Sequence, residues 1–294
     1  MRVAIIDVGS NSVRLLVADI SDGQVFSVMT RRITSRLLSG FDGHMLSPQS
    51  LERTGDAIEE FVITARTNGA NHIEAFGTSA MRDGLNRDAL IQRARFIGIP
   101  LRVLSGEEEA VLAYAGVAPE GKCAVLDIGG GSTEWLIGEN GNVLQAHSMQ
   151  IGAVRLFEAI GAIDMPRMKE MALAALSPAW TSAKAFPVDR VMGVGGTLTT
   201  LGALALNLSP YDPNVIEGYS LKASVAAQWF DRLCALSLDQ RKMLPGLTPE
   251  RADIIPFGSA IACAFFTLSG QSAMTLSDRD NLIGYIRKFF LKTP

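Results

Sequence analysis

The chain begins with a segment that it repeats later: Ala4-Ile-Ile-Asp7-Val-Gly9-Ser-Asn-Ser12-Val-Arg14-Leu-Leu-Val17 aligns with Ala124-Val-Leu-Asp127-Ile-Gly129-Gly-Gly-Ser132-Thr-Glu134-Trp-Leu-Ile137. The offset is constant at 120 residues, and Asp, Gly and Ser recur at equal positions between two apolar runs. Two copies without a third predict two domains of one fold rather than a solenoid.

Hydrophobic periodicity supports this division. The first half reads βββαβαβα, with strands near 2–7, 12–20, 23–31, 72–77 and 101–104 and helices at 48–68, 86–97 and from 105. The second half repeats this order, with strands near 122–128, 132–138, 142–149, 189–194 and 273–276 and helices at 152–161, 167–180, from 197, within 222–268 and at 280–292. Ser47 followed by Pro48 marks one helix start, and Ser105-Gly-Glu-Glu108 has capping-box spacing.

We therefore expect an N-terminal domain over 1–120 and a C-terminal domain over 121–294. The second domain carries a helical insertion at about 205–268. Alternatively, the last helix, about 282–294, packs on the first domain instead of the second.

Composition narrows the class of protein. Apolar residues make up 48% of 294 residues and charged residues 19%, which excludes a disordered chain. A net charge of −3 argues against a general nucleic-acid binder. Three widely spaced cysteines predict no disulfide framework and favour a reducing, cytoplasmic location.

Two long stretches lack charge, 191–211 and 254–277. Both are broken by glycine or proline, so they predict buried elements rather than membrane spans. A charge at Asp7 comes too early for a signal peptide, and we expect no membrane partner.

The repeated segment has the chemistry of an anion site. In each copy the two apolar runs predict a hairpin whose turn is Asp-x-Gly-x-x-Ser, and small turn residues leave backbone N–H groups accessible to an anion. Two such loops could hold one phosphate chain. An ordinary glycine-rich hairpin is the alternative for either loop alone.

These loops resemble the phosphate loops of the actin/Hsp70/sugar-kinase superfamily, and the chain as a whole resembles the exopolyphosphatase and guanosine pentaphosphate phosphatase (Ppx/GppA) family. The matching runs are Ile6–Leu15, Gly77–Asp83, Leu104–Ala110, Asp127–Glu134, Gly193–Thr197 and Glu250–Asp253. The resemblance implies two actin-like (RNase H-like) α/β domains facing across a cleft that holds the site. It also implies Mg²⁺-assisted hydrolysis of a terminal phosphoanhydride.

On this basis the candidate site residues divide by role. Loop amides, small side chains and guanidinium groups are expected to bind phosphate. This set is Gly9, Ser10, Asn11, Ser12, Arg14, Arg82, Gly129, Gly130, Gly131, Ser132, Gly195, Gly196, Thr197 and Arg251. For the arginines, surface salt bridges are the alternative.

Carboxylates are expected to hold the metal. Asp127 and Glu134 are hard oxygen ligands suited to Mg²⁺ or Mn²⁺, and Asp7 could reach the same ion through water. A solvated strand position is the alternative for Glu134.

Three glutamates open one predicted helix, and they point about 100° apart around it. Glu108 has the capping position, and Glu107 favours the positive end of the helix dipole. Glu109 matches the family's catalytic glutamate, which implies that it is the general base acting with Asp127 and Glu134.

The substrate implied is inorganic polyphosphate or a guanosine polyphosphate. A kinase of the same superfamily and a non-enzymatic guanosine tetra- or pentaphosphate sensor are the alternative functions, and a homodimer is also possible.

The sequence departs from longer relatives in lacking their further C-terminal region and in reading Ser277–Gly284 where Leu-Arg-x-Gly is common. With few motif-linked cations, helped by Arg31, Arg32 and Arg36, we expect low processivity on long chains.

Overall fold

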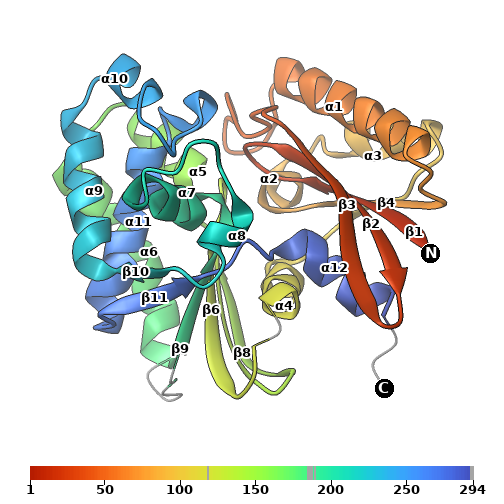
Figure 1. Cartoon of the computed structure of the whole chain (residues 1–294). Coiled ribbons are helices and arrows are strands. Elements are labelled where there is room, and N and C mark those ends of the chain that lie inside the picture. The colour runs from red at the N-terminus through yellow and green to blue at the C-terminus, as the bar shows by residue number, and fades with distance from the viewer. Residues whose placement is uncertain (118, 184–187, 189, 292–294) are drawn as a thin grey trace. The chain divides into compact units, whose positions relative to one another are not determined.

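The computed structural model describes residues 1–117, 119–183, 188 and 190–291. Contacts divide the chain into unit 1, Met1–Gly116 with Asn281–Pro294, and unit 2, Val117–Asp280. Each unit has one mixed β-sheet flanked by helices (Figure 1). The limits 1–120 and 121–294 stay a prediction about domains. By contacts, the last helix groups with unit 1.

Unit 1 contains a five-stranded sheet of order β3-β2-β1-β4-β5. Its strands are β1 (Arg2–Val8), β2 (Val13–Ser21), β3 (Gln24–Ile33), β4 (His72–Gly77) and β5 (Leu101–Val103). Its helices are α1 (Pro48–Thr67), α2 (Ser79–Asp83), α3 (Asp88–Phe96), α4 (Gly106–Val117) and α12 (Asn281–Phe289). The first three strands are antiparallel, whereas β1, β4 and β5 run parallel. This arrangement confirms the predicted βββαβαβα order, with α2 added.

The two faces of this sheet are covered by different helices. The α1 helix contacts β1 and β2, and α3 contacts α1. On the other face Ile5 and Leu16 pack with Leu112 of α4 and Ile286 of α12. The close approach of α12 to α4 requires a glycine, since a Cβ on Gly284 would lie 1.9 Å from the Leu112 carbonyl oxygen.

Unit 2 contains a six-stranded sheet of order β10-β11-β9-β6-β7-β8. Its strands are β6 (Lys122–Ile128), β7 (Thr133–Glu139), β8 (Asn142–Met149), β9 (Arg190–Val194), β10 (Ser220–Lys222) and β11 (Ala273–Leu276). Its helices are α5 (Ala153–Ile160), α6 (Met165–Ala183), α7 (Gly195–Ala205), α8 (Pro213–Ile216), α9 (Ala223–Ala235), α10 (Leu238–Lys242), the 3₁₀ turn η1 (Pro249–Arg251) and α11 (Ile255–Ser269). One aromatic cluster joins sheet and helices, with Trp135 against Trp180 and Phe265 at ring separations of 5.5 and 5.2 Å.

The two uncharged stretches are buried, as predicted. They form β9 with α7 and α11 with β11, and both helices are buried over most of their length. Within the described chain, no helix combines the length and apolarity that a membrane crossing needs.

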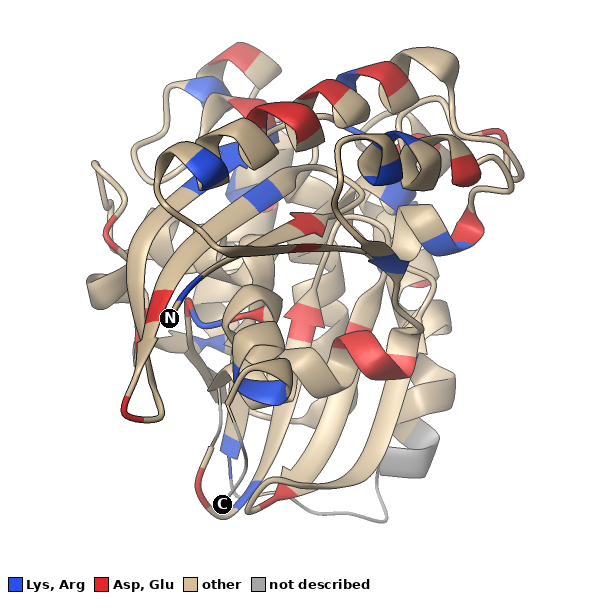
Figure 2. Cartoon of the chain, turned by 90° about the vertical axis from the view of Figure 1, so that its right-hand side faces the viewer, with Lys and Arg blue, Asp and Glu red and all other residues tan. Residues whose placement is uncertain are grey.

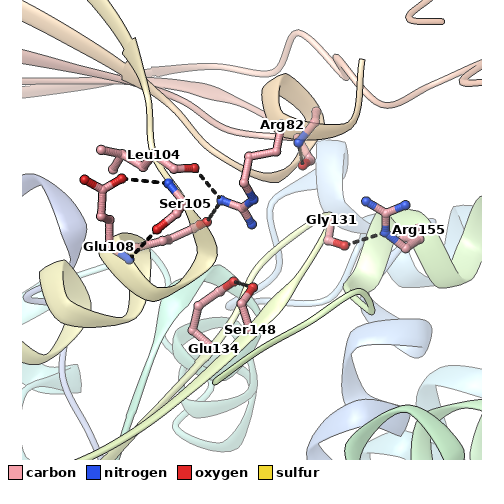
Figure 3. Close-up of polar contacts among 11 residues, drawn as sticks. Arg82, Leu104, Ser105, Glu108, Gly131, Glu134, Ser148 and Arg155 are labelled. Atoms are coloured by element: carbon pink, nitrogen blue, oxygen red, sulfur yellow. Dashed lines mark hydrogen bonds and ion pairs between the residues drawn. The ribbon is translucent and has the colours of Figure 1, made fainter. Parts of the chain in front are cut away.

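Local capping predictions are also confirmed. The Ser47 hydroxyl accepts from the Ser50 amide at the start of α1. Ser105 and Glu108 exchange both capping-box hydrogen bonds, at 3.1 and 2.8 Å (Figure 3). Glu108 thus caps the N-terminus of α4.

Other boundaries differ from expectation. The sequence does not signal α2, because five residues are too few for a periodic pattern, and it places the start of α7 at 197 rather than Gly195. The predicted helical insertion also contains the strand β10. Residue 189 of the predicted strand 189–194, and 292–294 of the last predicted helix, lie outside the described residues.

Acidic and basic positions are interspersed along the ribbon of each unit (Figure 2). This pattern agrees with the small net charge of −3. Any phosphate site must therefore rest on local clusters of cations, because the overall charge does not attract anions.

Candidate active site

The two repeated loops fold alike. In the first, the Gly9 amide donates to the Ser12 carbonyl at 3.1 Å, and in the second the Gly129 amide donates to the Ser132 carbonyl at 3.0 Å. A Cβ on Gly9 or Gly129 would lie 3.0 or 3.1 Å from that same carbonyl oxygen. Glycine therefore allows both tight turns.

The first loop is fixed by its surroundings. The side chains of Ser10, Asn11 and Ser12 are buried, and the Ser10 hydroxyl accepts from the Ala80 amide of α2 at 3.2 Å. The Arg36 amide donates to the Asn11 carbonyl at 2.8 Å. The loop is held from two sides, which is the preorganisation that a binding loop requires.

The second loop is tied to α5 through its carbonyls. The Gly129 carbonyl accepts from the Ala153 amide, and Gly130 accepts from Val154 and Arg155. Arg155 also donates from Nε to the Gly131 carbonyl at 2.6 Å (Figure 3). The predicted set omits Arg155, because no motif contains it and only the packing of α5 brings it to the loop.

Two predicted site residues bond each other at the start of the first hairpin. Asp7 and Arg14 lie directly opposite on β1 and β2, and Arg14 donates to Asp7 Oδ2 from Nε at 3.1 Å and from Nη2 at 2.5 Å. This pairing occupies one oxygen of a carboxylate predicted to approach a metal.

Glu109 is the buried member of the three glutamates. Its residue is 6% exposed in the first turn of α4, whereas Glu107 is exposed. Its Oε2 accepts from Arg82 Nη1 at 2.6 Å, and the same Nη1 reaches the Leu104 carbonyl at 3.2 Å (Figure 3). For Arg82 the structure therefore contains an ion pair within unit 1, and phosphate binding by Arg82 stays a prediction.

Burial raises the pKa of Glu109 to about 7. The charge and hydrogen bond of Arg82 oppose this shift, while the nearby Asp7 adds to it and Arg14 lowers the pKa. A carboxylate with a pKa near neutrality is suited to accept a proton during catalysis.

Two acids pair at the start of the second hairpin. Asp127 on β6 lies opposite Glu134 on β7, and they are 6% and 1% exposed. The Ser148 hydroxyl donates to Glu134 Oε1 at 2.7 Å (Figure 3). Glu134 is thus a buried position, not a solvated one.

This pair fits a hard divalent cation, because buried carboxylates placed side by side repel each other unless positive charge is present. Asp127 and Glu134 are the residues that would hold Mg²⁺ or Mn²⁺. Across the described residues, no group of three or more His, Cys, Asp or Glu side chains gathers in metal-binding geometry. Water would have to complete the coordination.

The start of α7 brings further predicted residues to Asp127. A Cβ on Gly195 would lie 2.0 Å from Asp127 Oδ1, and one on Gly196 would lie 2.0 Å from Arg251 Nη1. Thr197 follows in the same turn and is buried. The structure therefore assembles Asp127, Gly195, Gly196 and Arg251 at one helix end.

Gly195→Ala is expected to reduce activity more than 10-fold. Its φ of +83° costs an L-residue about 1–2 kcal/mol, and the added methyl displaces the Asp127 carboxylate. Gly141→Ala is the matched control, since Gly141 has a φ of +86° with open space around it. Steady-state rates and thermal unfolding of both variants separate the effects. A stability loss in both variants, at least as large at Gly195, with activity lost only at Gly195 is expected, and unchanged activity at Gly195 contradicts the assignment.

Two α/β units, each opening on an Asp-x-Gly-x-x-Ser hairpin, agree with the fold that the sequence resemblance implies. Residues 16–280 match the model of the Ppx/GppA phosphatase family. The chain belongs to this family.

Individual relatives agree over nearly the full chain. Exopolyphosphatase 2 of Mycobacterium tuberculosis is 32% identical over 309 aligned positions, which cover 96% of this chain and 97% of the relative. The crystal structure of the Aquifex aeolicus Ppx/GppA family member is 31% identical, with a TM-score of 0.82 and coverage of 99% and 98%.

A second group of relatives is longer. The guanosine-5'-triphosphate,3'-diphosphate pyrophosphatase of Vibrio vulnificus is 33% identical over 93% of this chain. The alignment covers 56% of that protein.

Proposed function

We propose that the chain releases the terminal phosphate from inorganic polyphosphate or from guanosine pentaphosphate. Family membership and the names of the relatives support a phosphoanhydride hydrolase. The observation that carries the proposal is Glu109, a buried carboxylate paired with Arg82, with a pKa raised to about 7. Such a group can take a proton from a water molecule that attacks phosphorus.

The other residues contribute binding and charge. The amides and hydroxyls of the two loops, with Ser12 and Ser132, are assigned to phosphate oxygens. Arg251, whose guanidinium lies on Gly196, is assigned to the same task in unit 2. Mg²⁺ held by Asp127 and Glu134 would offset phosphate charge when bound.

A substrate panel tests the proposal. Tripolyphosphate, long-chain polyphosphate, guanosine pentaphosphate and ATP with a sugar are incubated with the protein and Mg²⁺, and free phosphate is measured. We expect phosphate from at least one of the first three and no transfer from ATP to the sugar. Sugar phosphorylation would instead identify a kinase, and tight guanosine pentaphosphate binding without turnover would identify a sensor.

The pH profile should report Glu109. A general base works only when deprotonated, so kcat/KM, which reports the free enzyme, should rise with pH through a midpoint near 7. Arg82 lowers the pKa of Glu109, so Arg82→Gln should move this midpoint to higher pH as well as reduce the maximum. The measurement is kcat/KM from pH 5 to 9.

Arg102→Gln is the control for this shift. Arg102 of β5 bonds Glu108, the residue that precedes Glu109 on α4, and both side chains of this pair are substantially exposed. The pH midpoint of the Arg102→Gln variant should match that of the unmodified protein. A midpoint that stays in place in Arg82→Gln would refute the coupling between Arg82 and Glu109.

A further inference from the structure

Three charged residues form a row across the first sheet, next to the first loop. Asp7 on β1 lies opposite Arg14 on β2, and Arg14 lies opposite Arg32 on β3. Directly opposite residues on neighbouring strands present their side chains on the same face. The row therefore places one carboxylate and two guanidinium groups side by side.

The face on which this row lies can be identified. Two residues before Asp7 and two after Arg14, Ile5 and Leu16 pack against α4, the helix that carries Glu109. Because side chains alternate along a strand, Asp7, Arg14 and Arg32 share this face. Arg32 thus belongs to the same face as the predicted base.

Arg31, the residue before Arg32, faces the opposite side of the sheet. Arg31 lies opposite Leu15 and pairs with Glu60 of α1 at 3.4 Å, so it faces the other side of the sheet. The sequence offered Arg31, Arg32 and Arg36 as equivalent helpers. The register separates Arg31 from the site face and leaves it as a control.

Arg14 and Arg32 place two like charges directly opposite each other on neighbouring strands. Asp7 pairs with Arg14 in this row. The equivalent row in unit 2 reads Asp127, Glu134 and Ser148, so a glutamate and a serine stand where unit 1 has Arg14 and Arg32. The cations of the row are therefore particular to unit 1.

The backbone of Arg36 lies against the first loop. It has a φ of 52°, a left-handed conformation that is costly for a residue other than glycine. Its amide donates to the Asn11 carbonyl at 2.8 Å, and the Leu38 amide donates to Ser10 at 3.1 Å. Leu37 and Leu38 are buried and anchor the segment. The strained turn is therefore held directly on the loop, as strain at functional sites commonly is.

We propose that Arg32 and Arg36 form a second phosphate subsite beside the first loop, which binds the phosphates behind the terminal one in a linear polyphosphate chain. This inference rests on the proposed function for its substrate. It makes the two arginines determinants of affinity for chains of three or more phosphates. A guanidinium group binds two phosphate oxygens at once, which suits it to the phosphates of such a chain.

The test compares Arg32→Gln, Arg36→Gly and the control Arg31→Gln. Glycine at 36 retains the left-handed backbone while removing the guanidinium. With tripolyphosphate and longer chains, we expect KM to rise about 10-fold in each of the first two variants with kcat changed less than about twofold. The slope of log KM against log salt should fall by roughly one for each arginine removed. Arg31→Gln should change neither quantity.

The outcomes separate the subsite from the proposed function. If the unmodified protein hydrolyses polyphosphate and both variants keep its KM and salt slope, the subsite is wrong and the function stands. If no substrate is hydrolysed, the function is wrong, and calorimetry with tripolyphosphate then decides the subsite. If tripolyphosphate binds Arg32→Gln and Arg36→Gly more weakly than Arg31→Gln, the subsite is supported. If it binds all three variants equally, or binds none of them, the subsite is wrong.

Discussion

Glu109→Gln is expected to lower kcat by about 10²- to 10⁴-fold while changing KM little. Glutamine keeps the shape of the side chain and can still contact Arg82, but it cannot accept a proton from water. The effect should therefore fall on the chemical step. Phosphate release at saturating tripolyphosphate, over a range of enzyme concentrations, measures it.

Glu107→Gln is the matched control, because Glu107 is an exposed acid on the same helical turn. It should retain nearly full activity. Thermal unfolding of both variants checks that the fold is intact. Comparable losses in the two variants, or none in Glu109→Gln, would show that Glu109 is not the base.

Removal of divalent metal is expected to abolish activity. Excess EDTA should stop phosphate release, and added Mg²⁺ or Mn²⁺ should restore it, because both ions prefer oxygen ligands. Asp127→Asn and Glu134→Gln should each raise the Mg²⁺ concentration for half-maximal activity by roughly 10-fold or more, since each removes a charged ligand. Activity measured across a Mg²⁺ titration gives these values.

Glu139→Gln provides the control for the metal experiment. Glu139 ends the same strand as Glu134 but is exposed. Its Mg²⁺ requirement should not change. Full activity in excess chelator, or a shift in Glu139→Gln as large as in Glu134→Gln, would remove the assigned metal site from the mechanism.

The repeated hairpin is the part of the fold that the sequence predicts best. A constant offset between Asp7–Ser12 and Asp127–Ser132 links two short patterns, so each supports the other. Capping was also readable, because Ser105 and Glu108 interact over three residues. Such local features depend on near neighbours, which the sequence displays directly.

Contacts between distant segments were not readable in the same way. The sequence left the packing of the last helix on the first domain as an alternative, but it did not indicate the contact of Tyr285 with Glu74 at 2.7 Å, across most of the chain. Likewise, Arg82 and Glu109 each carry a motif signal, but neither motif indicates that they pair. Both contacts arise from the packing of whole elements, which no local pattern encodes.

The residue pairs that face each other across the two hairpins could have been predicted from the sequence, but they were not. Asp7 and Arg14 flank the first turn symmetrically, as Asp127 and Glu134 flank the second. A hairpin whose turn is known fixes which residues lie opposite each other. The carboxylate–arginine pair and the carboxylate pair follow from that register, as does the difference between the two units.

Hydrolysis of tripolyphosphate in ¹⁸O-enriched water tests the central claim most directly. Attack of water on the terminal phosphorus places the heavy oxygen in the released orthophosphate and leaves the pyrophosphate unlabelled. We predict this pattern, with label appearing in step with turnover in Mg²⁺ and at a strongly reduced rate in Glu109→Gln. Label in the pyrophosphate instead, or release of orthophosphate at equal rates by both proteins, would contradict attack on the terminal phosphate by a water that Glu109 activates.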